Sequence, residues 1–233
     1  MPMQIPPEKQ DWRQMRRMFW TIAPRYDFVT RLFSFGMDRR WKKIAVRRAS
    51  LHSGVVVLDL ACGTGDFALL VQRACPGSRV VALDLTAEML RRARARGVRG
   101  VVAGNALALP FRDGAFDVVF IGYGLRNFPD LSAALREIHR LTRPGGAVVS
   151  LDFFLPPPPL LRHVYLAWLY IQGAFWGLLL HGRPRVYTYI PDSLRGFLTI
   201  GEFSRVLRQH GFAPADAQSF IAGGIGIHWA VKQ

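Results

Sequence analysis

The stretch Leu58-Asp59-Leu60-Ala61-Cys62-Gly63-Thr64-Gly65-Asp66 follows a short apolar run and leads into a segment of helical composition. Its glycines let the backbone approach a ligand, and the free N–H groups at the start of the following helix point toward that ligand. The spacing of Gly63, Gly65 and Ala68 also fits the dinucleotide fingerprint GxGxxG/A. Asp84 ends the next apolar run, where an acidic side chain binds ribose hydroxyls in either case. The stretch therefore predicts a nucleoside-binding strand–loop–helix unit and leaves the cofactor open.

Short Val-rich runs alternate with helical segments on both sides of this loop. The runs predict strands, and the segments between them have the composition and apolar spacing of helices. Expected strands cover residues 55–60, 79–83, 100–103, 116–121 and 147–151, and expected helices cover 67–74, 87–96 and 131–141. The motif Arg143-Pro144-Gly145-Gly146 is expected to end the third helix and to turn into the fifth strand. Such alternation indicates a doubly wound α/β fold with a mostly parallel, buried sheet.

Further segments flank the alternating region. Residues 1–50 are expected to form a basic, aromatic helical lead-in to a domain that spans residues 51–233. Four prolines at 156–159 precede an apolar stretch at 164–180, and together they suggest a helical lid at about 156–195. A helix is expected at 201–209, followed by a closing pair of strands at 216–221 and 225–231. This pair brings the sheet to seven strands, without an internal repeat or an independent second domain.

The charge of the chain is strongly positive, with 31 Lys and Arg residues against 16 Asp and Glu, a net +15. Residues 1–50 hold twelve basic and four acidic side chains. Such a field attracts anions, whether nucleic acid or anionic lipid headgroups, although solvated charge without a partner fits as well. Cys62 and Cys75 form neither a disulfide framework nor a metal motif, and the six histidines are scattered, so we expect no metal site. With no signal-peptide pattern at the N-terminus, the reducing cytoplasm is the expected compartment.

The choice of cofactor depends on residues further along the chain. A nicotinamide-dependent enzyme of the short-chain type needs a Tyr-xxx-Lys pair, and the chain has no lysine between Lys43 and Lys232. The segment Gly104-Asn105-Ala106-Leu107-Ala108-Leu109-Pro110-Phe111 follows the third expected strand and precedes Phe116-Asp117. This is the arrangement expected of an S-adenosylmethionine enzyme, in which a polar residue after the third strand meets the adenine.

Several motifs resemble those of known enzymes. The loop at 58–66, the segment NALALPF with its following FD, and the RPGG motif look like class I methyltransferases, whose fold is Rossmann-like. Three motifs are more specific: IAPRYD at 22–27, SFGMDRRWK at 34–42 and GLRN at 124–127. In this order they resemble the demethylmenaquinone and ubiquinone C-methyltransferase family, from about residue 18 to the C-terminus. The resemblance implies a C-methyltransferase of quinone biosynthesis with S-adenosyl-L-methionine as its cofactor.

The resemblance also implies which residues bind the cofactor. Family members hold it with the loop glycines and with residues at the ends of the next strands. Carried over by motif, the set is Gly63, Thr64 and Gly65 of the loop, Asp84 and Leu85 at the ribose, Asn105 and Ala106 at the adenine, and Gly122. Thr64 is expected at the methionine end. Gly122 stands where serine is common in the family, so only a backbone contact could survive there.

The family's acceptor is a reduced quinone with a prenyl tail. The protein must align a ring carbon of this quinol with the methyl group and exclude water. The likeness places Tyr26, Arg126 and Asn127 at the neighbouring hydroxyl. A guanidinium is a poor base because its pKa lies above about 12, so we expect Arg126 to stabilise the phenolate while Tyr26 and Asn127 orient a water that removes the proton. Two plainer alternatives stay open: Tyr26 as a packing aromatic, and Arg126 as the ion-pair partner of Asp130.

The apolar stretch at 164–180 holds seventeen consecutive residues without a formal charge. This length is at the lower limit for a membrane span, and a lid over an apolar groove or an interfacial helix fits it as well. Arg183 and Arg185 just beyond could meet lipid phosphates. We therefore expect peripheral attachment to an anionic membrane, at the inner face of the cell membrane, through this stretch and the basic N-terminal region. A homodimer is a further possibility.

One departure from the family affects the acceptor. The pattern Tyr187-x-Tyr189-x-x-x-Ser193 is present, but residues 194–201 read LRGFLTIG where the family usually has a Pro-rich link with Gln. That segment is expected to border the substrate. A naphthoquinol, a benzoquinol and another apolar small molecule therefore all stay open as acceptors.

A nucleic-acid methyltransferase is the main rival, because a net charge of +15 suits a polyanion such as RNA. The fourth strand is expected to end in Ile121-Gly122-Tyr123-Gly124, without the (D/N)PP(Y/F) run with which amino-methylating enzymes hold a flipped base. A Pro-Cys nucleophile for cytosine C5 chemistry is missing too, so no nucleic-acid partner is expected. The non-enzymatic rival is a binding protein with an inactive cofactor loop, and the intact set of Thr64, Asp84 and Asn105 argues against it.

Overall fold

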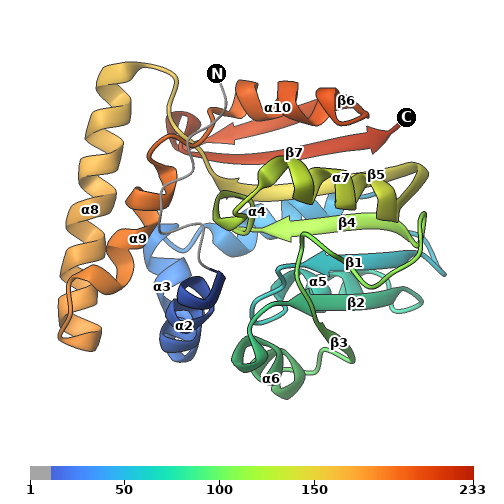
Figure 1. Cartoon of the computed structure of the whole chain (residues 1–233), viewed down its shortest axis with the longest axis horizontal. Coiled ribbons are helices and arrows are strands. Elements are labelled where there is room, and N and C mark those ends of the chain that lie inside the picture. Colours follow the sequence, from blue (N-terminus) through green and yellow to red (C-terminus); the bar gives the residue numbers. More distant parts are fainter. Residues whose placement is uncertain (1–11) are drawn as a thin grey trace.

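The computed structural model describes residues 12–233 and has a seven-stranded sheet with the strand order β3-β2-β1-β4-β5-β7-β6 (Figure 1). Neighbouring strands from β3 to β5 run parallel, whereas β7 is antiparallel to both β5 and β6. The strands are β1 (Val56–Leu60), β2 (Arg79–Asp84), β3 (Gly100–Ala103), β4 (Phe116–Gly122), β5 (Thr142–Phe153), β6 (Phe212–Phe220) and β7 (Ile225–Lys232). The predicted α/β class and mostly parallel seven-stranded sheet are confirmed.

Helices cover both faces of the sheet (Figure 1). On one side lie α4 (Asp38–Arg47), α5 (Asp66–Ala74) and α6 (Ala87–Ala95), and on the other α7 (Leu131–Leu141) and α10 (Ile200–Gln209). The central strands β1 and β4 are buried almost throughout, as expected for parallel strands between helix layers. The chain winds from β1 out to β3 and then returns to β4 on the other side of β1. The carboxyl ends of β1 and β4 therefore meet at a topological switch point, where α/β proteins bind ligands.

The segment 143–146 differs from its prediction. We expected a turn between helix and strand, but β5 begins at Thr142 and includes the whole segment. Thr142 pairs with Phe116, after which the β4–β5 register shifts. A Cβ on Gly146 would stand 2.8 Å from the carbonyl oxygen of Asp117, so a glycine is needed for the strands to approach here. The glycines mark an irregularity inside a strand rather than a turn before it.

Helices from both ends of the chain close over the carboxyl ends of the parallel strands. They are α2 (Trp12–Ile22), the 3-10 turn η1 (Ala23–Arg25) and α3 (Tyr26–Phe33) before the sheet, and α8 (Pro159–His181) and α9 (Arg185–Leu194) after β5. In Figure 1, α8 stands at the outer end of the molecule, with α9 between it and α3. The lead-in predicted for residues 1–50 is helical at 12–33 and 38–47, and residues 1–11 lie outside the described part of the chain.

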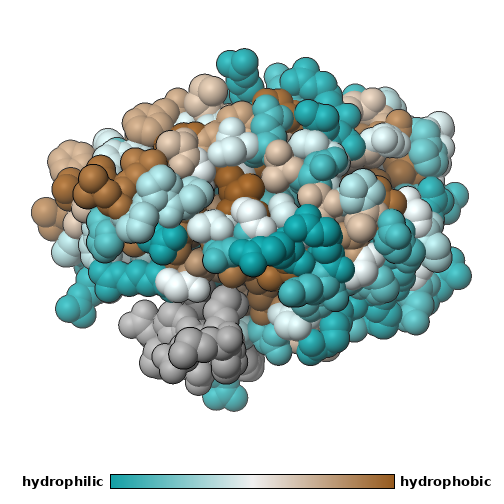
Figure 2. Space-filling view, turned by 90° about the horizontal axis from the view of Figure 1, so that it is seen from above, coloured by the Kyte–Doolittle hydropathy of each residue, from teal (hydrophilic) through white to brown (hydrophobic). Residues whose placement is uncertain are grey.

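Close backbone contact joins α8 to α9. A Cβ on Gly173 would stand 2.9 Å from the carbonyl oxygen of Tyr187, and Gly177 lies just as close to the start of α9. The Tyr170 hydroxyl also donates to Asp192 at 2.6 Å. The two helices therefore form one packed unit. Its outer surface is strongly hydrophobic, as Figure 2 shows at the end of the molecule where α8 lies.

Gly173 offers a direct test of this packing. Gly173→Ala is expected to lower the free energy of unfolding by about 1–3 kcal/mol, because the added methyl group presses on the backbone of α9. Gly201 in α10 is the matched control, since no atom lies within 4 Å of its Cβ position. Gly201→Ala should raise the stability by about 0.4–1 kcal/mol, because alanine restricts the unfolded chain. Urea unfolding measures both values, and equal stability of the two variants would contradict the close packing.

Candidate active site

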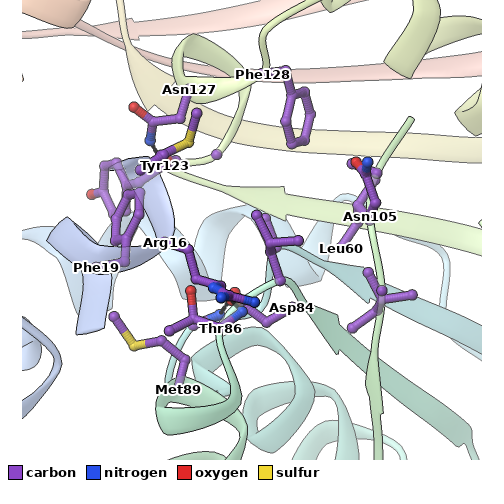
Figure 3. Close-up of a pocket in the computed structure, with 18 of the residues that line it drawn as sticks. Arg16, Phe19, Leu60, Asp84, Thr86, Met89, Asn105, Tyr123, Asn127 and Phe128 are labelled. Atoms are coloured by element: carbon purple, nitrogen blue, oxygen red, sulfur yellow. Dashed lines mark hydrogen bonds between the residues drawn. The ribbon is translucent and has the colours of Figure 1, made fainter. Parts of the chain in front are cut away.

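A cavity of about 230 Å³ lies at the carboxyl ends of β1, β2 and β4 and is bordered by α2 (Figure 3). We call it the outer cavity. Figure 3 shows Asp84 on its floor, with Asn105 and Asn127 on opposite sides. Apolar side chains form much of the remaining wall, among them Phe19, Leu60, Met89 and Phe128. The arrangement, a few polar groups placed in an apolar pocket at the switch point, suits a small organic ligand.

Asp84 is the buried carboxylate at the end of β2. One of its oxygens accepts the backbone N–H of Gly63 at 2.9 Å, and the other accepts that of Thr86 at 2.8 Å. Burial raises the pKa of Asp84, and these N–H groups work against the rise. The carboxylate is thereby held in one orientation between the glycine loop and the start of α6.

The three loop residues predicted to bind the cofactor take different positions. Gly63 lines the outer cavity with a φ of +53°, a conformation that favours glycine. Gly65 lies behind the loop, where a Cβ would stand 2.5 Å from the side chain of Val98. Thr64 is buried, and its hydroxyl donates to Asp27 of α3 at 2.6 Å. Thr64 and Gly65 shape the loop without lining the outer cavity, and their contact with the cofactor stays a prediction.

The residues predicted at the ribose and adenine ends come together in the outer cavity. Leu85, Asn105 and Ala106 all line it, together with Asp84. The side-chain oxygen of Asn105 accepts the N–H of Leu107 at 3.0 Å. This bond orients the amide within the loop that follows β3.

Gly122 also lines the outer cavity, and its surroundings account for its departure from the family. A Cβ at this position would stand 2.7 Å from the ring of Phe67. That ring is itself stacked on Phe120, with 5.0 Å between the centroids. A serine at position 122 would therefore require the Phe67 ring to move, and only the backbone of Gly122 faces the cavity.

A second cavity of about 20 Å³ adjoins the first, and we call it the inner chamber. Tyr26 and Tyr123 line both spaces and so form the wall between them. Arg126 faces the inner chamber, whereas Asn127 lines the outer cavity. The other walls are mostly apolar or aromatic side chains of α3, α9 and β5: Val29, Phe33, Phe153, Tyr187, Tyr189 and Ile190.

Arg126 lies in the 3-10 turn η2 (Leu125–Asn127) and is only 3% exposed. Its Nη1 donates to Asp152 at 2.5 Å and to the carbonyl oxygen of Tyr123 at 3.0 Å, and its Nε donates to the Ser193 hydroxyl at 3.2 Å. Burial acts to lower the pKa of Arg126, but Asp152 outweighs it and raises that pKa. The guanidinium is therefore charged, and three elements of the fold fix its position.

The alternative pairing of Arg126 with Asp130 is wrong. Asp130 instead caps α7 by accepting the N–H of Ala133 at 2.8 Å. The true partners, Asp152 and Ser193, were not among the predicted site residues. Asp152 follows from the same rule that identified Asp84, since both stand at carboxyl ends of parallel strands.

Tyr26 begins α3 and is partly buried. Burial raises the pKa of Tyr26 far above its ordinary value, and the nearby Tyr189 raises it further. Its phenol therefore remains protonated at neutral pH and is suited to donate a hydrogen bond. Its place between the two cavities brings it close to any molecule that spans them, while the packing alternative stays open.

An ion-pair network fixes the glycine loop to the N-terminal helices. Lys42 of α4 donates to Asp66 at 2.5 Å, and Arg96 donates to the other oxygen of Asp66 at 2.6 Å. Arg96 also donates to the carbonyl oxygen of Thr64 at 2.9 Å. Burial acts to raise the pKa of Asp66, but these two cations outweigh it and hold the pKa at about 2. Lys42 belongs to the SFGMDRRWK motif, so this motif holds the glycine loop in place through the ion pair with Asp66.

A family profile described as the ubiE/COQ5 methyltransferase family matches residues 8–232. The chain belongs to this family. It is thereby an S-adenosylmethionine-dependent methyltransferase, as the motifs predicted.

Named relatives of this methyltransferase cover nearly its whole length. A demethylmenaquinone methyltransferase of Thermus thermophilus is 42% identical over 84% of this chain and 91% of its own. One of Lactiplantibacillus plantarum is 36% identical over 93% and 94%. A ubiquinone/menaquinone biosynthesis C-methyltransferase of Syntrophotalea carbinolica is 38% identical over 91% and 92%.

Solved structures support the fold. The [4+2]-cyclase SpnF superposes with a TM-score of 0.69 at 19% identity, covering 99% of this chain and 98% of its own. A putative methyltransferase of Haloferax volcanii, solved with the Trm112 activator, gives 0.65 at 19% identity over 91% and 96%. Because one of these proteins is named for a cyclisation, the fold alone does not specify the reaction. No group of three or more His, Cys, Asp or Glu side chains within residues 12–233 is placed to hold a metal ion.

Asp59 gives this methyltransferase a pH-dependent stability. It lies buried on β1, accepts the N–H of Ala68 at 2.9 Å, and has a pKa raised to about 7, mainly by burial. In the unfolded chain the pKa of an aspartate is about 3.9. Between this pH and about 7 the folded protein therefore binds more protons than the unfolded chain, and the free energy of unfolding falls as the pH rises. Asp59→Asn keeps an acceptor for Ala68 and removes this loss. Its Tm advantage over the wild type should grow from pH 5 to pH 8.

Asp66→Asn is the control, because its effect on stability should depend on pH in the opposite direction. The pKa of Asp66 is lowered to about 2, so its carboxylate stabilises the fold at neutral pH, and this contribution is lost as the pH falls below about 4. The Tm deficit of Asp66→Asn should therefore shrink on acidification. Thermal unfolding across pH 3–8 measures both trends, and parallel curves for Asp59→Asn and wild type would refute the role of Asp59.

Proposed function

We propose that this methyltransferase transfers a methyl group from S-adenosyl-L-methionine to a ring carbon of a prenylated quinol in menaquinone or ubiquinone biosynthesis. The observation that carries the proposal is the pair of adjoining cavities, one polar-edged and one aromatic, with Tyr26 and Tyr123 between them. Relatives named demethylmenaquinone methyltransferase and ubiquinone/menaquinone biosynthesis C-methyltransferase support it. Another apolar small molecule is the alternative acceptor.

The outer cavity has the donor and acceptor groups that the cofactor needs. Asp84 offers a fixed carboxylate for the ribose hydroxyls, and Asn105 offers an amide near the adenine. Gly63 and Gly122 let the backbone approach closely, since neither carries a side chain into the space. When bound there, the cofactor supplies a methyl group already activated on a sulfonium. The protein's own task is then to orient the acceptor and to remove one proton.

The inner chamber suits a phenolic ring. Its aromatic walls pack against a flat ring, and Arg126 places a fixed positive charge where a hydroxyl of that ring becomes negative. Loss of the hydroxyl proton to water would let the electron pair of the O–H bond drive the ring carbon to bond the methyl group, while the methyl–sulfur bond breaks and its electrons stay on sulfur. The hydrogen of that ring carbon would then leave as a proton and the oxygen would be reprotonated, which restores the aromatic quinol with a net release of one proton. Tyr26 stays protonated and donates, so together with Asn127 it orients the departing water.

The inner chamber has to widen when the acceptor enters. Its volume of about 20 Å³ is far below the roughly 300 Å³ at which pockets hold organic ligands. One wall consists of α9, which is packed on α8. Together these two helices form the lid proposed at about 156–195. A movement of this lid would open the chamber toward the side on which α8 lies.

A prenyl tail also determines where the enzyme works. Such a tail lies in the bilayer, so we place the protein peripherally at the inner face of the cell membrane, with the head group reaching the inner chamber. RNA is the rival substrate, and retention on RNA at physiological salt would be the observation that favours it.

Mass spectrometry of the reaction product tests the proposed function. The purified enzyme, S-adenosyl-L-methionine and reduced demethylmenaquinone should yield a quinone heavier by one methyl group, with the label on carbon when methyl-labelled cofactor is used. A benzoquinol precursor with the same tail is run in parallel and identifies the ring type. A strain that lacks the gene should accumulate the lighter quinone. Methylation of neither ring, with cofactor bound, would leave another apolar acceptor and contradict the proposal.

Arg126 is the residue on which turnover is expected to depend most. Arg126→Gln should lower kcat by about 10²–10³-fold, as loss of a fixed charge stabiliser does, with little change in cofactor affinity because Arg126 faces only the inner chamber. Calorimetric titration with the cofactor and steady-state rates measure the two effects. The double variant Arg126→Gln with Asp152→Asn controls for the unpaired carboxylate. Wild-type turnover in the folded double variant would rule out the assignment.

A further inference from the structure

The outer face of α8 is an apolar stripe. Six large apolar side chains on it are each 57–79% exposed: Leu160, Val164, Ile171, Phe175, Leu178 and Leu179. At 3.6 residues per turn these positions fall within about 100° of the helix circumference and extend over about 28 Å. Figure 2 shows the corresponding hydrophobic surface at the end of the molecule. A patch of this size on one face marks an interaction site.

The opposite face of α8 is fixed to the rest of the protein. The Tyr165 hydroxyl donates to the carbonyl oxygen of Gly224 at 2.8 Å, and Gly173 lies against the backbone of α9. Among residues 12–233, α8 is long and apolar enough to cross a membrane, yet only 22% of its most apolar window is buried in the protein. To span a bilayer, α8 would have to break its contacts with α9 and with Gly224, the residue before β7. A helix held along one face can instead lie flat at an interface.

Aromatic side chains of α3 and of the turn that follows it extend this surface. Phe35 is stacked on Trp168 of α8 with 5.2 Å between the ring centroids, and Phe28 meets Trp176 edge-on at 6.2 Å. Both phenylalanines are themselves about half or more exposed. Arg31 stands three residues after Phe28, on the same side of α3, and is exposed. The face thus combines apolar and aromatic groups with a cation, as interfacial surfaces do.

The charged side chains on α8 and in the segment directly beyond it are all of one sign. No Asp or Glu occurs between Asp152 and Asp192, and this interval contains Arg162, Arg183 and Arg185. Arg183 and Arg185 are exposed directly beyond the C-terminal end of α8. An apolar stripe with arginines at its ends and no acidic group complements an anionic lipid surface.

We propose that the outer face of α8, with Phe28 and Arg31 of α3 and Phe35 just after it, docks flat on an anionic bilayer surface. The proposal rests on the proposed function, because it explains how a tail held in the bilayer reaches the enzyme. The same α9 that anchors α8 also forms a wall of the inner chamber. The docked face and the chamber are therefore separated by the packed pair of α8 and α9, and movement of this lid opens a path between them.

Vesicle flotation with the full-length protein tests the docking surface. Wild type should float with vesicles of equal parts phosphatidylcholine and phosphatidylglycerol at low salt, and far less with phosphatidylcholine alone. Ile171→Glu with Phe175→Glu should lower binding to the anionic vesicles at least about ten-fold, because two carboxylates enter the stripe. Arg136→Gln with Arg208→Gln, exposed on α7 and α10, makes the same change of −2 in net charge away from α8 and should bind as wild type.

Three outcomes would overturn the proposal. The first is absence of wild-type flotation with anionic vesicles, and the second is equal flotation of the stripe variant. The third is a wild-type dimer that the stripe variant converts to a monomer in sedimentation, which would assign the stripe to a second copy of the chain. Turnover of a short-tailed soluble quinol distinguishes a failure of the docking proposal from a failure of the proposed function. The stripe variant should keep wild-type kcat on it, whereas an enzyme with another acceptor would be inactive on it in either form.

Discussion

The buried ion pair between Arg126 and Asp152 is the interaction on which the site depends. Taking two charges out of water is costly, and one partner left alone would be more costly still. The cost is offset because Arg126 also donates to the carbonyl oxygen of Tyr123 and to Ser193. These bonds join the end of β4, the end of β5 and α9. The inner chamber exists where the three elements meet around one guanidinium.

The backbone conformation of Tyr123 is explained by the hydrogen bonds that the buried Arg126 needs. Tyr123 has a φ of +58°, a conformation that costs a non-glycine residue of order 1–3 kcal/mol. In this conformation its carbonyl oxygen accepts both Arg126 and the Asn127 amide, at 3.0 and 3.1 Å. A hydrogen bond from a charged donor contributes about 1.5–3 kcal/mol, enough to balance the strain. The strained residue is also the wall between the two cavities, so strain and function coincide at one position.

Sequence patterns predicted those parts of the site whose positions depend only on neighbouring residues in the chain. The glycine loop, Asp84 and Asn105 follow short strands, and their positions come from the strand–helix alternation alone. Arg126 was identified by its motif. The alternative that paired it with Asp130, four residues away, assumed helical spacing where the chain forms only a 3-10 turn. The real partners lie 26 and 67 residues away. Such pairings depend on which strands are neighbours and on how α9 folds back, and no local pattern contains that information.

The chamber is not equally easy to widen on every side. Widening on the side of β5 would separate a buried ion pair and disturb a strand paired on both edges. Widening on the side of α9 costs the bond from Arg126 to Ser193, a 3.2 Å contact with a neutral hydroxyl. A hydroxyl of the acceptor can replace that partner. Because α8 is packed on α9, the same displacement moves the apolar stripe. The proposed entry of the ring and the proposed docking of α8 are therefore mechanically linked.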